Sequence, residues 1–202
     1  MTDVLLATPE GIAAAAAILR DGGLVAFPTD TVYGVGCAAS HPDRVDALFE
    51  LKRRPIDRRI PMLVADIGSL PDGWVVDDRA RALAAAFWPG ALTLVLPASD
   101  DRPTQAFRAP DHPVAQALIA AAGPLLTTSG NVSDEPDTLE ADDVLIAFAT
   151  QADGLHAVVD GGRVPGGHAS TVLDLSTTPA RLVRQGPIAA AQLAEIVEVG
   201  GA

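Results

Sequence analysis

Short runs of Val and Leu alternate with longer Ala-rich segments along the 202 residues of this chain, and this alternation constrains its fold most strongly. The short runs fit buried strands, and the Ala-rich segments have the periodicity of helices. Aromatic residues make up only 4% of the chain, so we expect slim helices packed on a Val/Leu sheet. The order of the segments predicts an α/β fold with an open, twisted, mixed sheet and helices on both sides.

The expected elements follow from apolar periodicity and from Gly, Pro and capping residues at their ends. Helices are expected at 8–20, 40–54, 78–87, 113–121, 141–149 and 189–197. Strands are expected at 24–27, 35–39, 60–65, 91–96, 124–128, 157–160, 171–175 and 182–184. Segments 99–111 and 160–170 are the loops expected to move most. A chain of this length builds one core, which predicts a single domain over residues 1–202.

The formal net charge of −12 limits the partners of this protein. Binding to a nucleic-acid backbone requires an extended basic surface, so we do not expect a general nucleic-acid binder. Direct binding of tRNA is left open. The charge balance favours a small anionic ligand held in a pocket.

Cysteine, histidine and the N-terminal residues bear on metal binding and on cellular location. Cys37 is the single cysteine, and the four histidines have no ligand spacing, so no metal site of the protein's own is expected. The first residues lack the layout of a signal peptide, and no apolar run is long enough to cross a bilayer. We therefore expect a cytoplasmic protein with no membrane partner.

Positive charge is concentrated in one short segment that begins at Lys52, the only lysine. Five of the fourteen basic residues fall between Lys52 and Arg59. A local positive field in an acidic protein suits capture of a compact polyanion such as a nucleoside triphosphate. The segment also ends a predicted helix before Pro55, where the helix dipole favours cations. An exposed basic turn is therefore the simpler interpretation of the charge alone.

Two polar loops follow short apolar strands, which is the usual place for a ligand site in an α/β sheet. Residues 28–34 read Pro-Thr-Asp-Thr-Val-Tyr-Gly, and residues 125–131 read Leu-Leu-Thr-Thr-Ser-Gly-Asn. In the second loop, Ser129 and Asn131 flank a glycine that lets the backbone approach a phosphate or ribose closely. For residues 28–34, a tight turn capped by its own side chains is an equally good interpretation. Ser129 lacks the sequence context of a nucleophilic serine.

Residues 160–171 form a glycine-rich stretch. It lacks the Gly-Lys-Ser/Thr ending of a P-loop and precedes a strand rather than a helix, so it is not a Walker A site. We interpret residues 161–167 as a flexible lid that excludes water, anchored by Ser170 and Thr171.

Together these segments resemble the YrdC/YciO-type family of threonylcarbamoyl-adenylate synthases. Residues 28–34 match its P-T-[DE]-T-V-Y-G signature, Lys52-x-Arg54 and the proline after it match K-x-R-P, and Ser129-x-Asn131 matches S-x-N. The similarity continues in unbroken order through residues 89–95, 108–110, 170–174 and 184–186. The resemblance implies an open α/β fold around a concave ligand pocket.

The resemblance also implies an activity and a site. The reaction would be ATP-dependent synthesis of L-threonylcarbamoyladenylate from L-threonine and bicarbonate, with Mg²⁺ arriving on the ATP and pyrophosphate released. The product would serve N6-threonylcarbamoyladenosine formation at position 37 of tRNA, completed by downstream tRNA-modification proteins. The catalytic residues implied are Lys52 and Arg54. The ATP-binding residues expected are Lys52, Arg54, Thr127, Ser129, Asn131 and Arg184, and the residues expected to bind the amino acid are Thr31, Arg108 and Ser170.

Two other functions stay open at this point. A relative with the same fold would bind nucleotide or RNA without making the adenylate. A carbamoyl-transfer module of the hydrogenase-maturation type would normally belong to a longer chain with zinc-finger segments, and this sequence has none. The intact Lys52-x-Arg54 and Ser129-x-Asn131 pairs favour the synthase.

Overall fold

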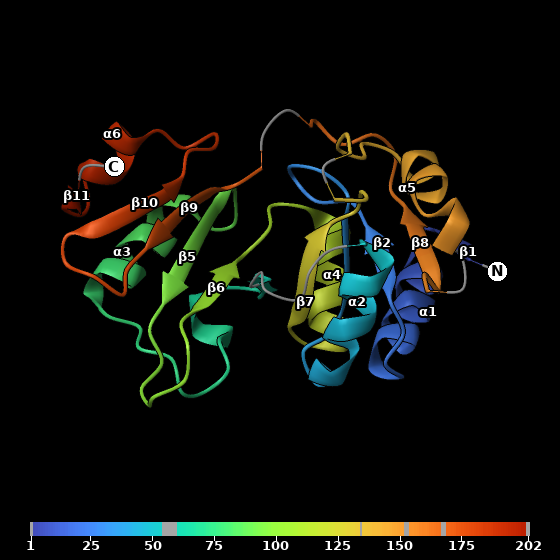
Figure 1. Ribbon diagram of the computed structural model, residues 1–202, viewed down its shortest axis with the longest axis horizontal. Coiled ribbons are helices and arrows are strands. Elements are labelled where there is room, and N and C mark those ends of the chain that lie inside the picture. Colours follow the sequence, from blue (N-terminus) through green and yellow to red (C-terminus); the bar gives the residue numbers. More distant parts are fainter. Residues whose placement is uncertain (1, 54–59, 134, 152–153, 167–168, 201–202) are drawn as a thin grey trace.

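The computed structural model of the protein describes residues 2–53, 60–133, 135–151, 154–166 and 169–200. Within these residues, eleven strands form one open sheet with helices packed against it (Figure 1). In the order in which neighbours pair, the strands are β1 (Asp3–Leu6), β8 (Ala157–Asp160), β2 (Val25–Phe27), β3 (Gly34–Ala38), β7 (Leu125–Ser129), β4 (Met62–Leu63), β6 (Gln105–Arg108), β5 (Leu92–Leu96), β9 (Thr171–Asp174), β10 (Ala180–Arg184) and β11 (Val199–Gly200).

Helices connect most of these strands. The α-helices of the described residues are α1 (Pro9–Arg20), α2 (Val45–Leu51), α3 (Asp78–Phe87), α4 (Pro113–Ala122), α5 (Ala141–Ala147) and α6 (Ala190–Ala194). Short 3₁₀ turns are η1 (Pro42–Arg44), η2 (Ile67–Ser69) and η3 (Ala149–Gln151). Thr8 and Asp77 cap α1 and α3, because each side chain accepts a hydrogen bond from a backbone N–H three residues further on. The helices predicted at 8–20 and 78–87 are confirmed.

Parallel and antiparallel pairs are mixed through the sheet, as the sequence predicted. Strands β1 and β2 run parallel to β8, whereas β3 runs antiparallel to β2 and β7. The two-residue strand β4 pairs antiparallel to β7 and parallel to β6, and it joins the two ends of the sheet. We call the end with β1, β8, β2, β3 and β7 the α1 half, and the end with β6, β5, β9, β10 and β11 the α3 half.

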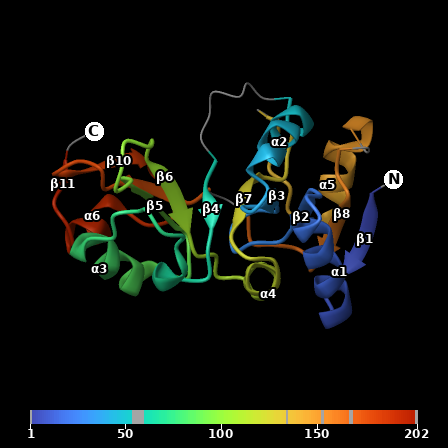
Figure 2. The ribbon, with the colours of Figure 1, turned by 90° about the horizontal axis from the view of Figure 1, so that it is seen from below.

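The two halves are covered differently (Figure 2). In the α1 half, one core cluster lies under α1 and α4 and another lies under α2 and α5. In the α3 half, one core cluster gathers Leu92, Leu94 and Leu96 of β5 with α3 and α6 on a single face. No helix of the described residues lies on the other face of the α3 half in this view. Helices on both sides of the sheet are therefore a property of the α1 half.

Three of the observed strands have no counterpart among the predicted ones. Strand β1 leaves most of its short length exposed and β11 has two residues, so neither shows a buried apolar run in the sequence. Strand β6 lies within 99–111, and the prediction of a mobile loop there was wrong for Gln105–Arg108. This segment pairs with β4 and β5 on its two sides, so its partners rather than its apolar content make it a strand.

Two other elements were predicted to be longer than they are. The strand predicted at 60–65 is reduced to the two residues of β4, and the last helix extends over only five residues instead of 189–197. The sheet itself is continuous through both halves. The single domain over residues 1–202 and the concave ligand pocket stay predictions. Among the described helices, none combines the length and the apolar character needed to span a membrane.

Candidate active site

The C-terminal end of α2 meets the polar end of β7. Lys52 caps α2, and its Nζ donates hydrogen bonds to the Ser129 carbonyl oxygen (2.6 Å), to Ser129 Oγ (3.1 Å) and to Asn131 Oδ1 (3.2 Å). Lys52 is only 2% exposed. A buried ammonium needs acceptors for its N–H groups, and these three oxygens meet that need. The structure thus brings together three residues that the sequence assigned to one phosphate site.

Two further hydrogen bonds hold this arrangement in place. The Lys52 carbonyl accepts one from Ser133 N at 3.2 Å, and Asn131 Nδ2 donates one to the Glu135 carbonyl at 2.6 Å. The loop after β7 is therefore bound to the end of α2 and folded back on itself. Its polar side chains keep a fixed orientation, as a ligand site requires.

This contact includes three of the six residues predicted to bind ATP. Arg54, also predicted to be catalytic, lies outside the described residues. Thr127 is buried on β7, and its hydroxyl has no hydrogen-bond partner within the described part of the chain. A buried hydroxyl without a partner is unusual and is available to a ligand or to water, so its contact with ATP stays a prediction.

A second cluster forms around Arg108 at the end of β6. Its Nη2 contacts Asp30 Oδ1 at 2.6 Å, its Nη1 donates to Thr31 Oγ1 at 3.1 Å, and its Nε donates to the Gly90 carbonyl at 3.0 Å. The ion pair is largely buried, with side-chain exposures of 9% for Arg108 and 15% for Asp30. Two of the five guanidinium N–H groups have no partner among the described residues. They form a donor pair for a carboxylate or phosphate.

The hydroxyl protons beside Arg108 can be assigned from the hydrogen bonds. Thr29 Oγ1 donates its single proton to the Val32 carbonyl at 2.7 Å. The 3.1 Å contact between the two threonine hydroxyls must then be donated by Thr31. Because Thr31 Oγ1 also accepts from Arg108, it has one lone pair left and no proton to give. Thr31 offers a ligand an acceptor, whereas Arg108 offers donors.

A third cluster lies where β9 begins and β10 ends. Arg184 Nε donates to the Ser170 carbonyl at 3.0 Å, and Arg184 Nη2 donates to Ser170 Oγ at 3.2 Å. Ser170 Oγ also shares a 2.7 Å hydrogen bond with Thr93 Oγ1. Burial and the nearby charge of Arg108 lower the pKa of Arg184, and the charge of Asp137 opposes them. The two arginines are close enough to repel each other, so an anion between them would stabilise both.

Strands β3 and β7 place the polar loops side by side. They pair antiparallel with Gly34 opposite Ser129, so the loop before β3 and the loop after β7 leave the sheet at the same edge. The Gly130 N–H donates to the Tyr33 carbonyl at 2.7 Å and joins the two loops. The loop that holds Thr31 therefore lies next to the loop that binds Lys52.

Sequence reasoning missed three contributors to these clusters. Asp30 fixes Arg108, Thr93 shares the Ser170 hydroxyl, and Asp137 faces Arg184 through its charge. The signal for Asp30 was present, because it is the carboxylate of the 28–34 motif. Thr93 lies in the matched segment 89–95, whereas Asp137 lies in no matched segment. Neither could be paired from local signals, because Ser170 and Arg184 are distant in the chain.

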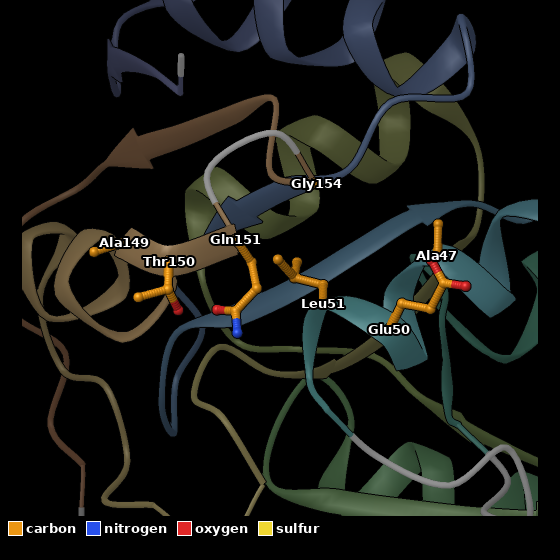
Figure 3. Close-up of a pocket in the computed structure, with 7 residues that line it drawn as sticks. All are labelled: Ala47, Glu50, Leu51, Ala149, Thr150, Gln151 and Gly154. Carbon is orange, nitrogen blue, oxygen red and sulfur yellow. The ribbon is translucent and has the colours of Figure 1, made fainter.

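A hollow of about 450 Å³ lies between α2 and η3 (Figure 3). Glu50 and Leu51 line it from α2, and Thr150 and Gln151 line it from η3. Arg53 donates a hydrogen bond to Thr150 Oγ1 at 2.9 Å. None of the described residues that were predicted to bind ATP or the amino acid lines this hollow, so we do not assign it to the site.

The fold and the three clusters define a mixed-sheet α/β protein in which buried cationic side chains are paired with hydroxyl and carbonyl oxygens. The Sua5/YciO/YrdC sequence profile, described as telomere recombination, matches residues 17–186. The chain belongs to the Sua5/YciO/YrdC family.

Relatives in this family cover almost the whole chain. It is 39% identical to the threonylcarbamoyl-AMP synthase of Bacillus subtilis over 209 residues, which is 98% of this chain and 59% of that protein. It matches the structure of Pyrococcus abyssi Sua5 in complex with L-threonine with a TM-score of 0.88 and 32% identity, over 99% of this chain and 62% of that one. The chain thus spans about three fifths of each of these two relatives.

A shorter relative has the same fold over its full length. Escherichia coli YciO matches with a TM-score of 0.84 and 24% identity, over 96% of this chain and 100% of that one. At this identity the likeness shows the fold alone. The predicted open, mixed α/β sheet is confirmed by this match and by the match to Sua5.

Proposed function

We propose that this protein is an L-threonylcarbamoyladenylate synthase. It would join L-threonine, bicarbonate and ATP, release pyrophosphate, and so begin the formation of N6-threonylcarbamoyladenosine at position 37 of tRNA. The observation that carries the proposal is the contact of Lys52 with Ser129 and Asn131, next to the loop that presents Thr31 to Arg108. The name of the Bacillus subtilis relative and the threonine complex of Pyrococcus abyssi Sua5 support it.

The proposed chemistry has two steps. The neutral threonine amine adds to bicarbonate through its lone pair, and one water leaves, which gives a carbamate. A carbamate oxygen then forms a bond to the α-phosphorus of ATP, and the bond from that phosphorus to the oxygen bridging to the β-phosphate breaks. Pyrophosphate leaves with the electron pair of that bond.

Both reactants of the second step are anions, so the site must offset their repulsion. At about 4 Å in a partly desolvated site, one cation offsets on the order of 4 kcal/mol. Lys52 supplies this charge next to Ser129 and Asn131. A phosphate oxygen that replaces one of its present acceptors would leave the ammonium paired and free a hydroxyl or an amide for the phosphate. Arg54 is proposed as the second cation.

The polarity around Arg108 fits an amino acid. The two remaining N–H groups of Arg108 suit a carboxylate, and the lone pair of Thr31 Oγ1 suits an N–H or O–H of the same ligand. Ser170 adds a hydroxyl that Arg184 holds in place. In this arrangement Arg184 also contributes positive charge toward the nucleotide, as the resemblance implies.

The oxygen atoms near Lys52 are poorly suited to bind Mg²⁺ directly. The oxygens of Ser129 and Asn131 accept hydrogen bonds from an ammonium, whose charge repels a metal ion. Among the described residues, no group of three or more His, Cys, Asp or Glu side chains is placed to hold one. Mg²⁺ therefore fits this site when it is carried by the phosphates of ATP, where it would neutralise charge on the leaving pyrophosphate. The downstream tRNA-modification proteins and the cytoplasmic location stay predictions.

One reaction series tests the proposal. The protein is incubated with ATP, Mg²⁺, bicarbonate and one of several amino acids, and pyrophosphate release and the mass of the adenylate are measured. We expect both signals with threonine, and neither when bicarbonate is omitted. Release with serine or without an amino acid, but not with threonine, would assign a different substrate. No release under any condition would favour a binding protein of the same fold.

A further inference from the structure

The first six residues of the glycine-rich segment after β8, 161–166, contact the loop that holds Thr31 and the core of the α1 half. The segment leaves β8 in the α1 half and leads toward β9 in the α3 half (Figure 1). The Val164 N–H donates to the Leu139 carbonyl at 2.9 Å, and the Gly166 N–H donates to the Thr31 carbonyl at 2.9 Å. The Val164 side chain is buried in the core cluster that includes Tyr33. These contacts hold residues 164 and 166 against the rest of the protein, and the expectation of a mobile lid over residues 161–167 stays a prediction. Residues 167 and 168 lie outside the described part of the chain.

Tyr33 fixes the start of this segment. Its ring is fully buried, and its hydroxyl donates to the Gly162 carbonyl at 2.8 Å and accepts from the Gly161 N–H at 3.3 Å. Burial raises the pKa of the phenol, the Gly161 N–H opposes this, and the charges of Asp160, Glu140 and Asp143 add to it. The hydroxyl therefore keeps its proton, and with it the hydrogen bond to the carbonyl.

The far end of the segment requires a glycine. Gly166 has a φ of +68°, and a Cβ there would lie 2.7 Å from the Leu139 side chain. A residue without a side chain lets the backbone N–H reach the Thr31 carbonyl. Thr31 is therefore held on two sides, since its carbonyl accepts from Gly166 and its hydroxyl accepts from Arg108.

We propose that Tyr33 is a positioning residue that couples the segment 161–166 to the amino-acid site through Thr31. The part that concerns the amino acid rests on the proposed function. A ligand on Arg108 and the Thr31 hydroxyl restricts Thr31, so it stabilises the hydrogen bond from Gly166. By reciprocity, a segment that is firmly held by Tyr33 keeps Thr31 in place and strengthens binding of the amino acid.

The first test needs no substrate. Tyr33→Phe removes one oxygen and leaves the ring, so in the full-length protein it should speed amide hydrogen exchange at Gly161, Gly162 and the distant Gly166. The increase should be on the order of five-fold or more, because a lost hydrogen bond raises the open population by about that factor. Faster exchange at Gly161 and Gly162 with no change at Gly166 would overturn the coupling.

The matched control lies in the same segment. Arg163 forms an ion pair with Glu140 at 2.6 Å, and both side chains are exposed. Arg163→Gln removes this pair without touching the Tyr33 contacts, so exchange at Gly166 should stay at the wild-type rate. If Arg163→Gln and Tyr33→Phe had the same effect, Tyr33 would have no special role.

The second test uses the reaction. Tyr33→Phe should raise the KM for threonine on the order of five-fold while the KM for ATP stays within about two-fold. A general loss of structure would change both constants and would lower the melting temperature, which is measured in parallel. Equal changes in both KM values would overturn the proposal.

A third measurement separates this proposal from the proposed function and uses the unaltered protein. Threonine alone should slow exchange at Gly166 several-fold. If it does so and no adenylate forms, the coupling holds and the synthase activity is wrong. If adenylate forms and threonine leaves the exchange at Gly166 unchanged, the coupling is wrong and the activity holds.

Discussion

The α1 half and the α3 half differ in how they are covered and in what they bring to the site. The α1 half has helices on both faces and supplies Lys52 and Ser129, whereas the α3 half has helices on one face and supplies Arg108 and Arg184. A doubly covered sheet can exclude water around a buried ammonium. In the other half, Arg108 keeps two N–H groups that have no partner among the described residues. Arg108, at 7% exposure, is nevertheless buried like Lys52, at 2%. The two halves therefore differ in the cation that they bring, an ammonium or guanidinium groups, and not in its burial.

The tryptophans and the tyrosine allow the two halves to be followed separately by spectroscopy. Trp74 and Trp88 are its two tryptophans, and both pack in the α3 half. Tyr33 is the single tyrosine and lies in the α1 half. Tryptophan fluorescence therefore reports one half, and tyrosine absorbance reports the other. Each prediction below uses this division or the chemistry of one half.

Arg108→Ala is expected to have the largest effect. It leaves the carboxylate of Asp30 buried without its cation, which should lower the free energy of unfolding by about 3–5 kcal/mol. Because the ion pair joins the two halves, denaturant should shift the tryptophan and the tyrosine transitions together. Threonine-dependent pyrophosphate release should also be lost.

The control for this prediction is an exposed ion pair within the α3 half. Asp100 and Arg102 are in contact at 2.8 Å with side-chain exposures of 55% and 49%. Asp100→Asn should lower the free energy of unfolding far less than Arg108→Ala does, because solvent screens an exposed pair. If Asp100→Asn and Arg108→Ala destabilised the protein equally, the buried pair would not be a special link between the halves.

Lys52→Ala should lower turnover by about 10²–10³-fold, because it removes a charge aimed at the reacting phosphate. Pyrophosphate release measures the effect, and circular dichroism checks the fold. Lys52→Arg is the matched variant, since it keeps the charge but its planar fork cannot reproduce the compact ammonium contact with Ser129 and Asn131. We expect Lys52→Arg to stay well below wild-type turnover. Wild-type turnover in Lys52→Ala would remove the phosphate role from this residue.

Arg184→Gln should raise the KM for ATP about tenfold, which is the size of a lost charge-assisted hydrogen bond. The stability should change little, because the variant also relieves the repulsion from Arg108 that lowers the pKa of Arg184. Steady-state kinetics with ATP and with threonine would measure it. An increase only in the KM for threonine would place Arg184 in the amino-acid site instead.

The smallest effect is expected at low pH and in the α3 half. Burial alone would raise the pKa of Asp77 and Asp174, but hydrogen bonds and a neighbouring arginine outweigh it and hold both below the ordinary value of 3.8. A carboxyl of this kind stabilises the fold above its unfolded pKa, and that stability is lost as the pH falls through the folded pKa. Below about pH 3.8, tryptophan fluorescence should therefore change before tyrosine absorbance. The reverse order would show that the α1 half is the more acid-sensitive one.

Local signals account for what could be predicted. The helix at 78–87 has a capping aspartate and a buried alanine-leucine face, and the strand at 157–160 is a short apolar run. The motif loops were visible because polar residues directly follow apolar strands. In these places the sequence pattern and the three-dimensional structure agree.

Pairing across long stretches of chain could not be predicted from local patterns. Lys52 and Ser129 are 77 positions apart, and Asp30 and Arg108 are 78 positions apart. Strand β6 exists because β4 and β5 border it, although its own sequence has little apolar content. Only the resemblance to a family grouped the distant site residues before the structure was known. The pairing of Asp30 with Arg108 was not indicated by any motif and is seen in the structure.

Strand β4 has a mechanical consequence for a site built in this way. Its two residues, Met62 and Leu63, make up the whole width of the sheet between β7 and β6. A sheet bends most easily where its strands are shortest. The stiffness of β4 and its pairing with β7 and β6 therefore sets how firmly the distance between Lys52 and Arg184 is kept. If the proposed function holds, a strand of only two amino acids would therefore help determine how large a molecule fits between the two cations.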